Sequence, residues 1–115
     1  MPVRPHILVI EDDPLVSEVV IDALGDRYDT TRAETAAEGL ERLRAGGVDL
    51  ILLDCTLPGG LGEALVPTAD SDHVPVILMS GNPGTAEQVP GRRPLVLKPF
   101  SLAALLDTVQ GVLGR

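Results

Sequence analysis

Short runs of continuous apolar residues alternate along this chain with segments of helical periodicity, and this alternation restricts the fold more than any other feature. The apolar runs lie at residues 6–10, 50–53, 74–79 and 94–97, and a more polar run of strand-forming residues occupies 28–33. A strand that is apolar on both faces must be covered on both faces, which is typical of parallel sheets. The pattern predicts an α/β domain with a doubly wound parallel sheet, in which the polar strand lies nearer an edge.

Three of the connecting segments carry clear signals for the start of a helix. Asp13 followed by Pro14 indicates an N-cap and the first helical residue. Thr35 and Glu38 match a capping box, and Ser101 precedes a final amphipathic helix.

The other two connections are weak. After the third strand only residues 61–66 are expected to be helical, because Pro67 interrupts the segment. After the fourth strand, proline and glycine leave residues 85–89 for about one turn at most. We therefore expect shortened third and fourth helices, and we expect Arg92 and Arg93 to lie in a solvated turn.

Composition limits the possible partners. The 115 residues predict a single domain, 1–115, and the formal net charge of −8 with scattered basic residues argues against direct binding of nucleic acid. Cys55 is the single cysteine, which excludes an intrachain disulfide, fits a reducing cytoplasm and favours a packed small residue over a redox centre. No apolar run approaches the roughly 20 residues that span a bilayer, so a cytoplasmic location without membrane contact is expected.

The single lysine, Lys98, lies between the apolar run 95–97 and Pro99, while the other eight basic residues are all arginines. An unpaired ammonium group at the end of a core strand would cost several kcal/mol, so Lys98 needs an anion nearby. The candidate carboxylates also follow strands: Glu11, Asp12 and Asp13 after the first, and Asp54 after the third. Because ligands of doubly wound sheets bind at the carboxyl ends of the strands, these residues predict a functional site.

Four motifs at these strand ends carry a resemblance to a known family. They are residues 7–14 (ILVIEDDP), 52–58 (LLDCTLP) with Gly62, 76–81 (VILMSG) and 96–101 (VLKPFS). In this order they resemble the receiver domain of two-component response regulators, of the kind found in chemotaxis regulators. The resemblance covers essentially the whole chain. The resemblance implies a flavodoxin-like sheet of five strands in the order 2-1-3-4-5. A single-domain regulator and the receiver of a hybrid histidine kinase both remain open.

The resemblance also implies how the phosphoryl group is handled. Asp54 would be the phosphoacceptor, and Lys98 and the Ser80 hydroxyl would each contact a phosphoryl oxygen. The backbone N–H groups of Thr56 and Gly81 could add to this cradle. The implied donor is a sensor histidine kinase or a histidine phosphotransfer protein, and the downstream protein is unknown.

A divalent cation, Mg²⁺ or Mn²⁺, is part of the same implication. Asp12 and Asp54 would bind it directly, Glu11 largely through water, and the Thr56 carbonyl would complete the protein ligands. Asp13 is expected to cap the first helix instead.

Two positions that tune phosphoryl lifetime among receivers are Thr56 and Asn82 in this chain. Neither is a carboxylate, so modest autodephosphorylation is expected. Receivers usually carry an aromatic residue three positions before the lysine, and here that residue is Leu95. This departure and the short fourth helix put the usual output mode in doubt.

Three functions follow from these observations. The first is a phosphoacceptor regulatory domain, which is not an enzyme beyond its own phosphorylation and dephosphorylation. The second is a pseudo-receiver that binds partners without phosphorylation. The third, a small Mg²⁺-dependent aspartyl-phosphate phosphatase, is disfavoured because Thr56 stands where that class needs a second acid and the chain has no room for a cap.

Overall fold

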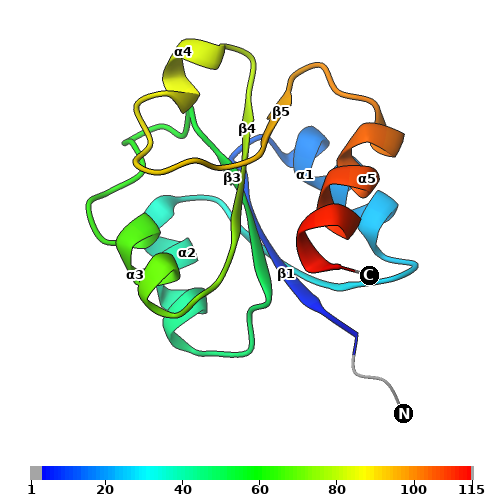
Figure 1. Cartoon of the computed structure of the whole chain (residues 1–115), viewed down its shortest axis with the longest axis horizontal. Coiled ribbons are helices and arrows are strands. Elements are labelled where there is room, and N and C mark those ends of the chain that lie inside the picture. Colours follow the sequence, from blue (N-terminus) through cyan, green and yellow to red (C-terminus); the bar gives the residue numbers. More distant parts are fainter. Residues whose placement is uncertain (1–3, 115) are drawn as a thin grey trace.

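A parallel sheet with the strand order β2-β1-β3-β4-β5 forms the centre of the molecule (Figure 1). The strands are β1 (His6–Ile10), β2 (Asp29–Ala33), β3 (Leu50–Asp54), β4 (Val76–Ser80) and β5 (Leu95–Leu97). The computed structural model describes residues 4–114, so residues 1–3 and Arg115 of the expected domain lie outside the described residues. The predicted strands and strand order are confirmed, and the polar strand β2 is an edge strand.

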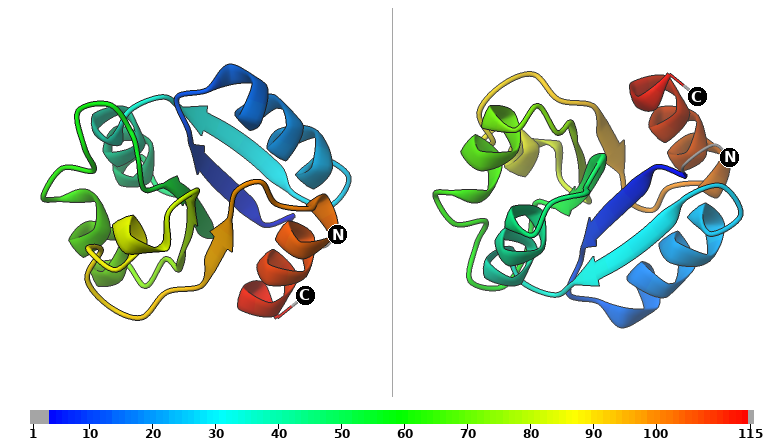
Figure 2. Two further views of the ribbon diagram at one scale, coloured as in Figure 1. Left: turned by 90° about the horizontal axis from the view of Figure 1, so that it is seen from above. Right: turned by 90° about the horizontal axis from the view of Figure 1, so that it is seen from below.

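Helices cover both faces of this sheet. They are α1 (Pro14–Leu24), α2 (Ala36–Arg44), α3 (Leu65–Ser71), α4 (Pro83–Ala86) and α5 (Leu102–Leu113). Helices α1 and α5 lie on one face and α2 and α3 on the other, as Figures 1 and 2 show from three directions. Within residues 4–114, no helix combines the length and the apolarity needed to cross a bilayer.

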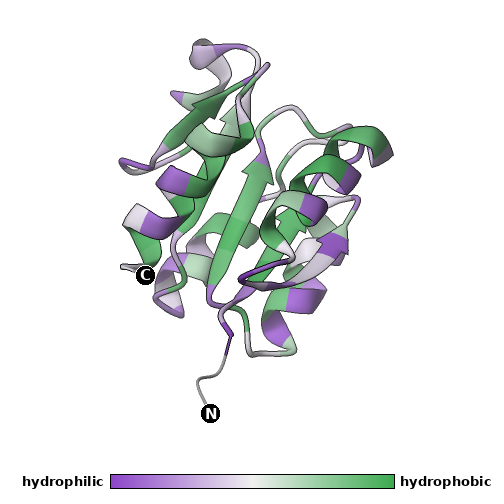
Figure 3. Ribbon diagram, turned by 90° about the vertical axis from the view of Figure 1, so that its right-hand side faces the viewer, coloured by the Kyte–Doolittle hydropathy of each residue, from purple (hydrophilic) through white to green (hydrophobic). Residues whose placement is uncertain are grey.

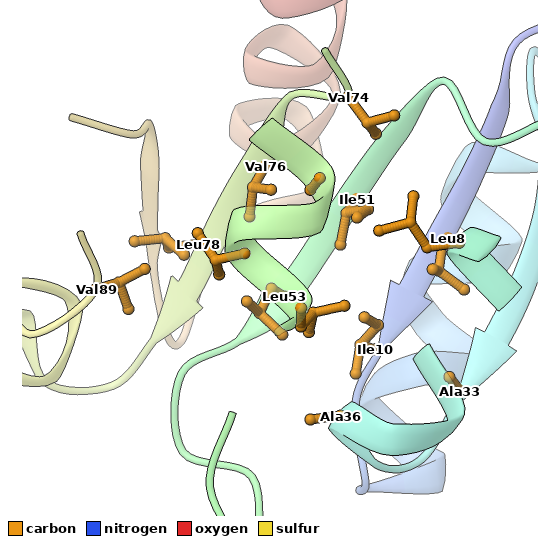
Figure 4. Close-up of a cluster of buried hydrophobic side chains, with 14 of the residues drawn as sticks. Leu8, Ile10, Ala33, Ala36, Ile51, Leu53, Val74, Val76, Leu78 and Val89 are labelled. Atoms are coloured by element: carbon orange, nitrogen blue, oxygen red, sulfur yellow. The ribbon is translucent and has the colours of Figure 1, made fainter. Parts of the chain in front are cut away.

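The alternation of side chains along the strands divides the core into two clusters. Leu8, Ile10, Ile51 and Leu53 pack under α2 and α3, in the cluster that Figure 4 shows. The residues between them, among them Val9, face α1 and α5. Because the central strands are apolar on both faces, they appear as continuous hydrophobic ribbons in Figure 3.

The three predicted helix caps are confirmed. Asp13 Oδ1 accepts a hydrogen bond from the Leu15 N–H at 2.9 Å, and Ser101 Oγ accepts one from the Ala104 N–H at 3.0 Å. Thr35 Oγ1 accepts a hydrogen bond from the N–H of Glu38 at 3.1 Å. Each cap satisfies an N–H group of a first turn, and the Asp13 cap makes the chain leave β1 in a defined direction.

The third helix differs from the prediction, which placed it at residues 61–66. The helix begins at Leu65 and ends at Ser71, with Ala64 as its N-cap. Pro67 therefore lies in the first turn, where a backbone N–H has no acceptor within the helix and proline costs little. The prediction treated Pro67 as a helix end, whereas the fold uses it near a helix start.

The fourth connection is short, as predicted, because α4 has 4 residues, but the helix lies at Pro83–Ala86 and not at the predicted residues 85–89. Pro83 is its first residue, a position that tolerates proline.

Arg92 is exposed, but the prediction of a solvated turn is wrong for Arg93, whose side chain is only 9% exposed. Its guanidinium donates to both carboxylate oxygens of Asp70, at 2.9 and 2.7 Å, and to the Pro90 carbonyl at 2.8 Å. Arg93 thus joins the connection between α4 and β5 to the end of α3.

We predict that Arg93→Gln lowers the free energy of unfolding by about 1–2 kcal/mol, because it removes a bidentate pair and leaves the Pro90 carbonyl without this donor. Arg92→Gln is the matched control and should change stability by less than about 0.5 kcal/mol, since Arg92 is exposed. Urea denaturation of both variants measures the difference. Equal stabilities would show that the pair with Asp70 does not hold the connection.

Candidate functional site

The strand register brings the polar residues that follow β1, β3, β4 and β5 to one edge of the sheet. Ile10 pairs with Leu53, and Asp54 pairs with Met79, so Glu11 and Asp54 leave neighbouring strands side by side. Ser80 pairs with Leu97, the residue before Lys98. Because all strands are parallel, these residues meet at the carboxyl edge of the sheet.

Lys98 joins the two buried carboxyl groups at this edge. Its Nζ lies 2.7 Å from Glu11 Oε1 and 3.5 Å from Asp54 Oδ2. Glu11 is 0% exposed and Asp54 is 2% exposed, whereas the Lys98 side chain keeps 24% of its surface open to solvent. The expectation that the lone lysine pairs with carboxylates at strand ends is confirmed. Lys98 is followed by a cis peptide bond to Pro99.

Asp54 is held by the residue two positions further along the chain. The Thr56 N–H donates to Asp54 Oδ1 at 2.9 Å, and the Thr56 hydroxyl donates to the same oxygen at 2.8 Å. These bonds leave Asp54 Oδ2 as the oxygen nearer Lys98. The side chain therefore has one oxygen fixed by the backbone of its own loop and one beside a cation.

Glu11, Asp12 and Asp54 form an acidic cluster, in which carboxylate oxygens of all three residues lie within 4.8 Å of one another. Asp12 is exposed, while its two partners are buried. Carboxylate oxygens in such a group, with room for water on the Asp12 side, are the ligands that Mg²⁺ prefers. The cluster could therefore hold a small divalent cation.

The environment separates the pKa values of the two buried acids. Burial raises the pKa of Glu11 to about 7, and the nearby Asp54 adds to this effect against the opposing influence of Lys98. Burial also opposes the ionisation of Asp54, but hydrogen bonds from Glu11 and Thr56 and the charge of Lys98 outweigh it and lower the pKa of Asp54. Below about pH 7 the pair therefore carries its negative charge mainly on Asp54.

Lys98 stays charged in this environment. Burial alone would favour the neutral amine, but the hydrogen bond with Glu11 and the charges of Asp54 and Glu11 raise the pKa of Lys98.

Cys55, next to Asp54, is half-buried, and burial with the charge of Asp54 raises its pKa to about 11. Cys55 is thus a protonated thiol at neutral pH and a poor nucleophile.

Ser80 reaches the same edge, but its hydroxyl is turned towards the following loop. Ser80 Oγ lies 2.8 Å from the Asn82 carbonyl and 2.6 Å from Thr85 Oγ1. Asn82 uses its own side chain to cap α4, accepting a hydrogen bond from the Gly84 N–H at 2.9 Å. Gly81 is exposed at the end of β4. The structure therefore gathers Glu11, Asp12, Asp54, Thr56 and Lys98, and places the side chains of Ser80 and Asn82 in an adjoining turn.

Thr85 is a residue that the sequence analysis missed. Its position three residues after Asn82, with Pro83 between them, is the spacing of an N-cap and the last residue of a first turn. That signal could have located the turn but not the contact between the Ser80 and Thr85 hydroxyls.

Leu95, which replaces the aromatic residue usual in receivers, packs against the core under α2 and α3, and Phe100 packs on the opposite face.

Comparison with known proteins gives a consistent result. Residues 7–110 match the model of the response regulator receiver domain. The chain is 35% identical to the transcriptional regulatory protein CseB of Streptomyces coelicolor, over 97% of this chain and 50% of that protein. It is 34% identical to the DNA-binding response regulator MtrA of Mycolicibacterium smegmatis, over 97% of this chain and 52% of that protein. The chain thus spans about half the length of these relatives.

A solved structure supports the fold. The chemotaxis protein CheY4 of Vibrio cholerae superimposes with a TM-score of 0.81 at 21% identity, covering 96% of this chain and 99% of that one.

In metal-free protein we expect the stability to fall as the pH rises from about 5 to about 8. The unfolded state ionises Glu11 near pH 4.5, whereas the folded state retains the proton up to a pKa of about 7. The proton therefore stabilises the fold fully below the unfolded-state pKa, and this stabilisation is lost as the pH rises through the folded-state pKa.

Glu11→Gln keeps the shape of the side chain but cannot ionise, so its loss of stability over this range should be smaller by on the order of 1–2 kcal/mol. Urea denaturation in EDTA at several pH values measures this difference. Titrating groups that do not contact Glu11 cancel in the comparison of the two proteins. Parallel stability curves would contradict the raised pKa of Glu11.

Proposed function

This chain belongs to the response regulator receiver domain family, and on that premise we propose that Asp54 is its phosphoacceptor. The donor would be phosphohistidine on a sensor histidine kinase or a histidine phosphotransfer protein. The observation that carries the proposal is the contact of buried Asp54 with Lys98, beside Glu11 and Asp12. Such a site suits transfer of a dianionic group better than it suits a purely structural ion pair.

The chemistry follows from the charges at the site. An oxygen of ionised Asp54 attacks phosphorus and forms a P–O bond, while the P–N bond to the donor imidazole breaks. The electron pair of that bond returns to the imidazole nitrogen, which takes up a proton. Lys98 stands on the Oδ2 side of Asp54 and would contact an oxygen of the transferred group. The N–H groups of Thr56 and Gly81 could donate to the others.

Glu11, Asp12 and Asp54, with the Thr56 carbonyl, would hold Mg²⁺ or Mn²⁺ in this proposal. The cation would reduce the repulsion between the attacking carboxylate and the phosphoryl oxygens. The residues fit such a cation because the three carboxyl groups already converge and Asp12 opens the cluster to water. The high pKa of Glu11 in the metal-free protein agrees with an acid that ionises when a cation arrives.

The rim of the site supports a protein as the donor. Leu15 and Val19 of α1 are 72% and 49% exposed, which is unusual for large apolar side chains. With Val16, Pro99 and Phe100 they line an apolar groove that reaches Lys98. A protein that brings a phosphohistidine to Asp54 must cover this rim, and it would bury the apolar surface as it does so.

The relatives named as transcriptional or DNA-binding regulators are about twice as long as this chain. The net charge of −8 gives this domain no basis for binding DNA itself. We therefore propose that phosphorylation acts through a downstream protein contact, in the cytoplasm. A phosphorylation-independent interaction module is the second candidate, and Leu95 with the 4-residue α4 favours it.

Incubation with acetyl phosphate and Mg²⁺ should add one phosphoryl group to the protein, as measured by intact mass. Asp54→Asn and the addition of EDTA should each abolish the gain. Asp26→Asn, which neutralises an exposed acid away from the site, is the matched control and should behave as wild type. No gain by the wild type, with Mg²⁺ binding shown separately, would favour the phosphorylation-independent module.

The lifetime of the phosphorylated form should depend on residue 82. Asn82→Glu should speed its decay about threefold or more relative to Asn82→Gln, because a carboxylate can accept a proton from the attacking water. Both variants lose the Asn82 cap of α4, so this loss cancels in the comparison. The measurement is the decay of the phosphorylated mass after removal of the donor. Equal decay rates would show that a carboxylate at residue 82 does not assist the attacking water.

A further inference from the structure

The Ser80 hydroxyl is fully buried, and among the described residues all of its hydrogen bonds go to Asn82, which precedes α4, and to Thr85 in α4. Ser80 Oγ accepts a hydrogen bond from the Asn82 N–H at 3.0 Å. It also lies 2.8 Å from the Asn82 carbonyl and 2.6 Å from the Thr85 hydroxyl, which is itself 2.7 Å from the same carbonyl. Two hydroxyl groups and one carbonyl thus form a closed set of contacts.

The number of hydrogens in this set limits what Ser80 can do. A hydroxyl carries one hydrogen and can donate one hydrogen bond. In one arrangement Thr85 donates to Ser80 and Ser80 donates to the Asn82 carbonyl. In a second, Ser80 donates to Thr85 and Thr85 donates to the carbonyl. In a third, both hydroxyls donate to the Asn82 carbonyl. In all three arrangements the single hydrogen of Ser80 is used within these contacts.

Helix α4 has few other contacts that would hold it. It has 4 residues, none of them buried, and the Asn82 side chain caps it. Ala86 is partly buried against the core under α2 and α3, and Thr85 is half-buried. The contacts of Thr85 and Asn82 with Ser80 are therefore a substantial part of what ties α4 to the end of β4.

We propose that Thr85 is a positioning residue that holds the Ser80 hydroxyl in the α4 turn and so opposes its use by a phosphoryl group on Asp54. This inference rests on the proposed function, since the phosphoryl oxygen is the competing acceptor. An oxygen of that group can only accept, so Ser80 must withdraw its one hydrogen from the turn to donate to it. Ser80 therefore cannot donate to the phosphoryl group and keep its donated hydrogen bond within the turn at the same time. This competition couples phosphorylation of Asp54 to the state of the α4 turn.

The coupling gives the domain an output that needs no aromatic residue at position 95. When Ser80 withdraws, Thr85 loses one of its two side-chain partners and α4 is held less firmly. Thr85 also lines a cavity of about 430 Å³, together with Gly62 and Val66 of the α3 region and Gln88 beyond α4. A change at Thr85 therefore reaches a surface between two connections, where a downstream protein could detect it.

The test uses beryllofluoride, a phosphoryl mimic, and measures its apparent affinity in the presence of Mg²⁺ by isothermal titration calorimetry. Thr85→Val removes the hydroxyl at nearly constant shape, and it should bind three- to tenfold more tightly than wild type, because one hydrogen bond of the turn no longer competes. Thr85→Ser retains a hydroxyl and should bind as wild type. A merely structural role for Thr85 would weaken binding or leave it unchanged, and either result would overturn the inference.

The same Thr85→Val substitution in a Ser80→Ala variant distinguishes loss of the Ser80–Thr85 contact from general effects on α4. In Ser80→Ala, the further change Thr85→Val should alter the affinity less than twofold, because the competing hydrogen is already gone. A three- to tenfold gain in this background would also overturn the inference. If neither wild type nor any variant binds beryllofluoride, the proposed function fails, and the inference fails with it.

Wild-type protein provides a measurement that needs no variant. Hydrogen exchange of the amides in residues 84–88 should become faster when beryllofluoride and Mg²⁺ are bound, since α4 loses contacts with Ser80. Exchange that stays the same or slows would contradict the release of the turn, even where the mimic binds.

Discussion

The contact of Lys98 with Glu11 and Asp54 is the interaction on which the rest of this edge depends. Two carboxyl groups that are almost fully buried lie on adjacent strands, and their proximity without a cation would be strongly unfavourable. Lys98 follows β5. In the sheet β4 lies between β5 and β3, and both β3 and β4 lie between β5 and β1, so the Lys98 side chain must reach across these strand ends. The strand order, the end of β5 and the long stem of lysine are therefore all needed to bring the Lys98 ammonium to both carboxyl groups.

The two buried acids beside Lys98 have pKa values that move in opposite directions. Glu11 accepts from Lys98 but lies in a fully buried pocket, and its pKa rises to about 7. Asp54 also receives two hydrogen bonds from Thr56, and its pKa falls. The two acids differ because Glu11 keeps a proton and shares it in a hydrogen bond with Asp54, and because Thr56 in the loop after β3 donates to Asp54. Asp54 is thus kept ionised beside a neighbour, Glu11, whose carboxyl group holds its proton up to about pH 7.

Much of the fold and site could be predicted, because local chemistry and strand ends decide them. Asp13, Thr35 and Ser101 cap helices as their sequence context indicates, and the acids and Lys98 converge because parallel strands end at one edge. The failures share a physical cause. Pro67 is compatible with either end of a helix, and its role depends on where packing starts α3. Arg93 became buried because Asp70, 23 residues away, lies beside it in space.

The sequence by itself determined the sheet, its covered faces and the group of charges at its carboxyl edge, since side-chain periodicity and strand ends follow from the order of residues. Only the tertiary structure decided which acceptor is contacted by a polar group that has several within reach. The Ser80 hydroxyl has one hydrogen and several acceptors within reach of its loop, and the sequence does not rank them. Their ranking depends on the short α4 turn, which brings Thr85 to 2.6 Å from Ser80. A choice among acceptors of similar chemistry is a matter of distance and angle, and packing sets both.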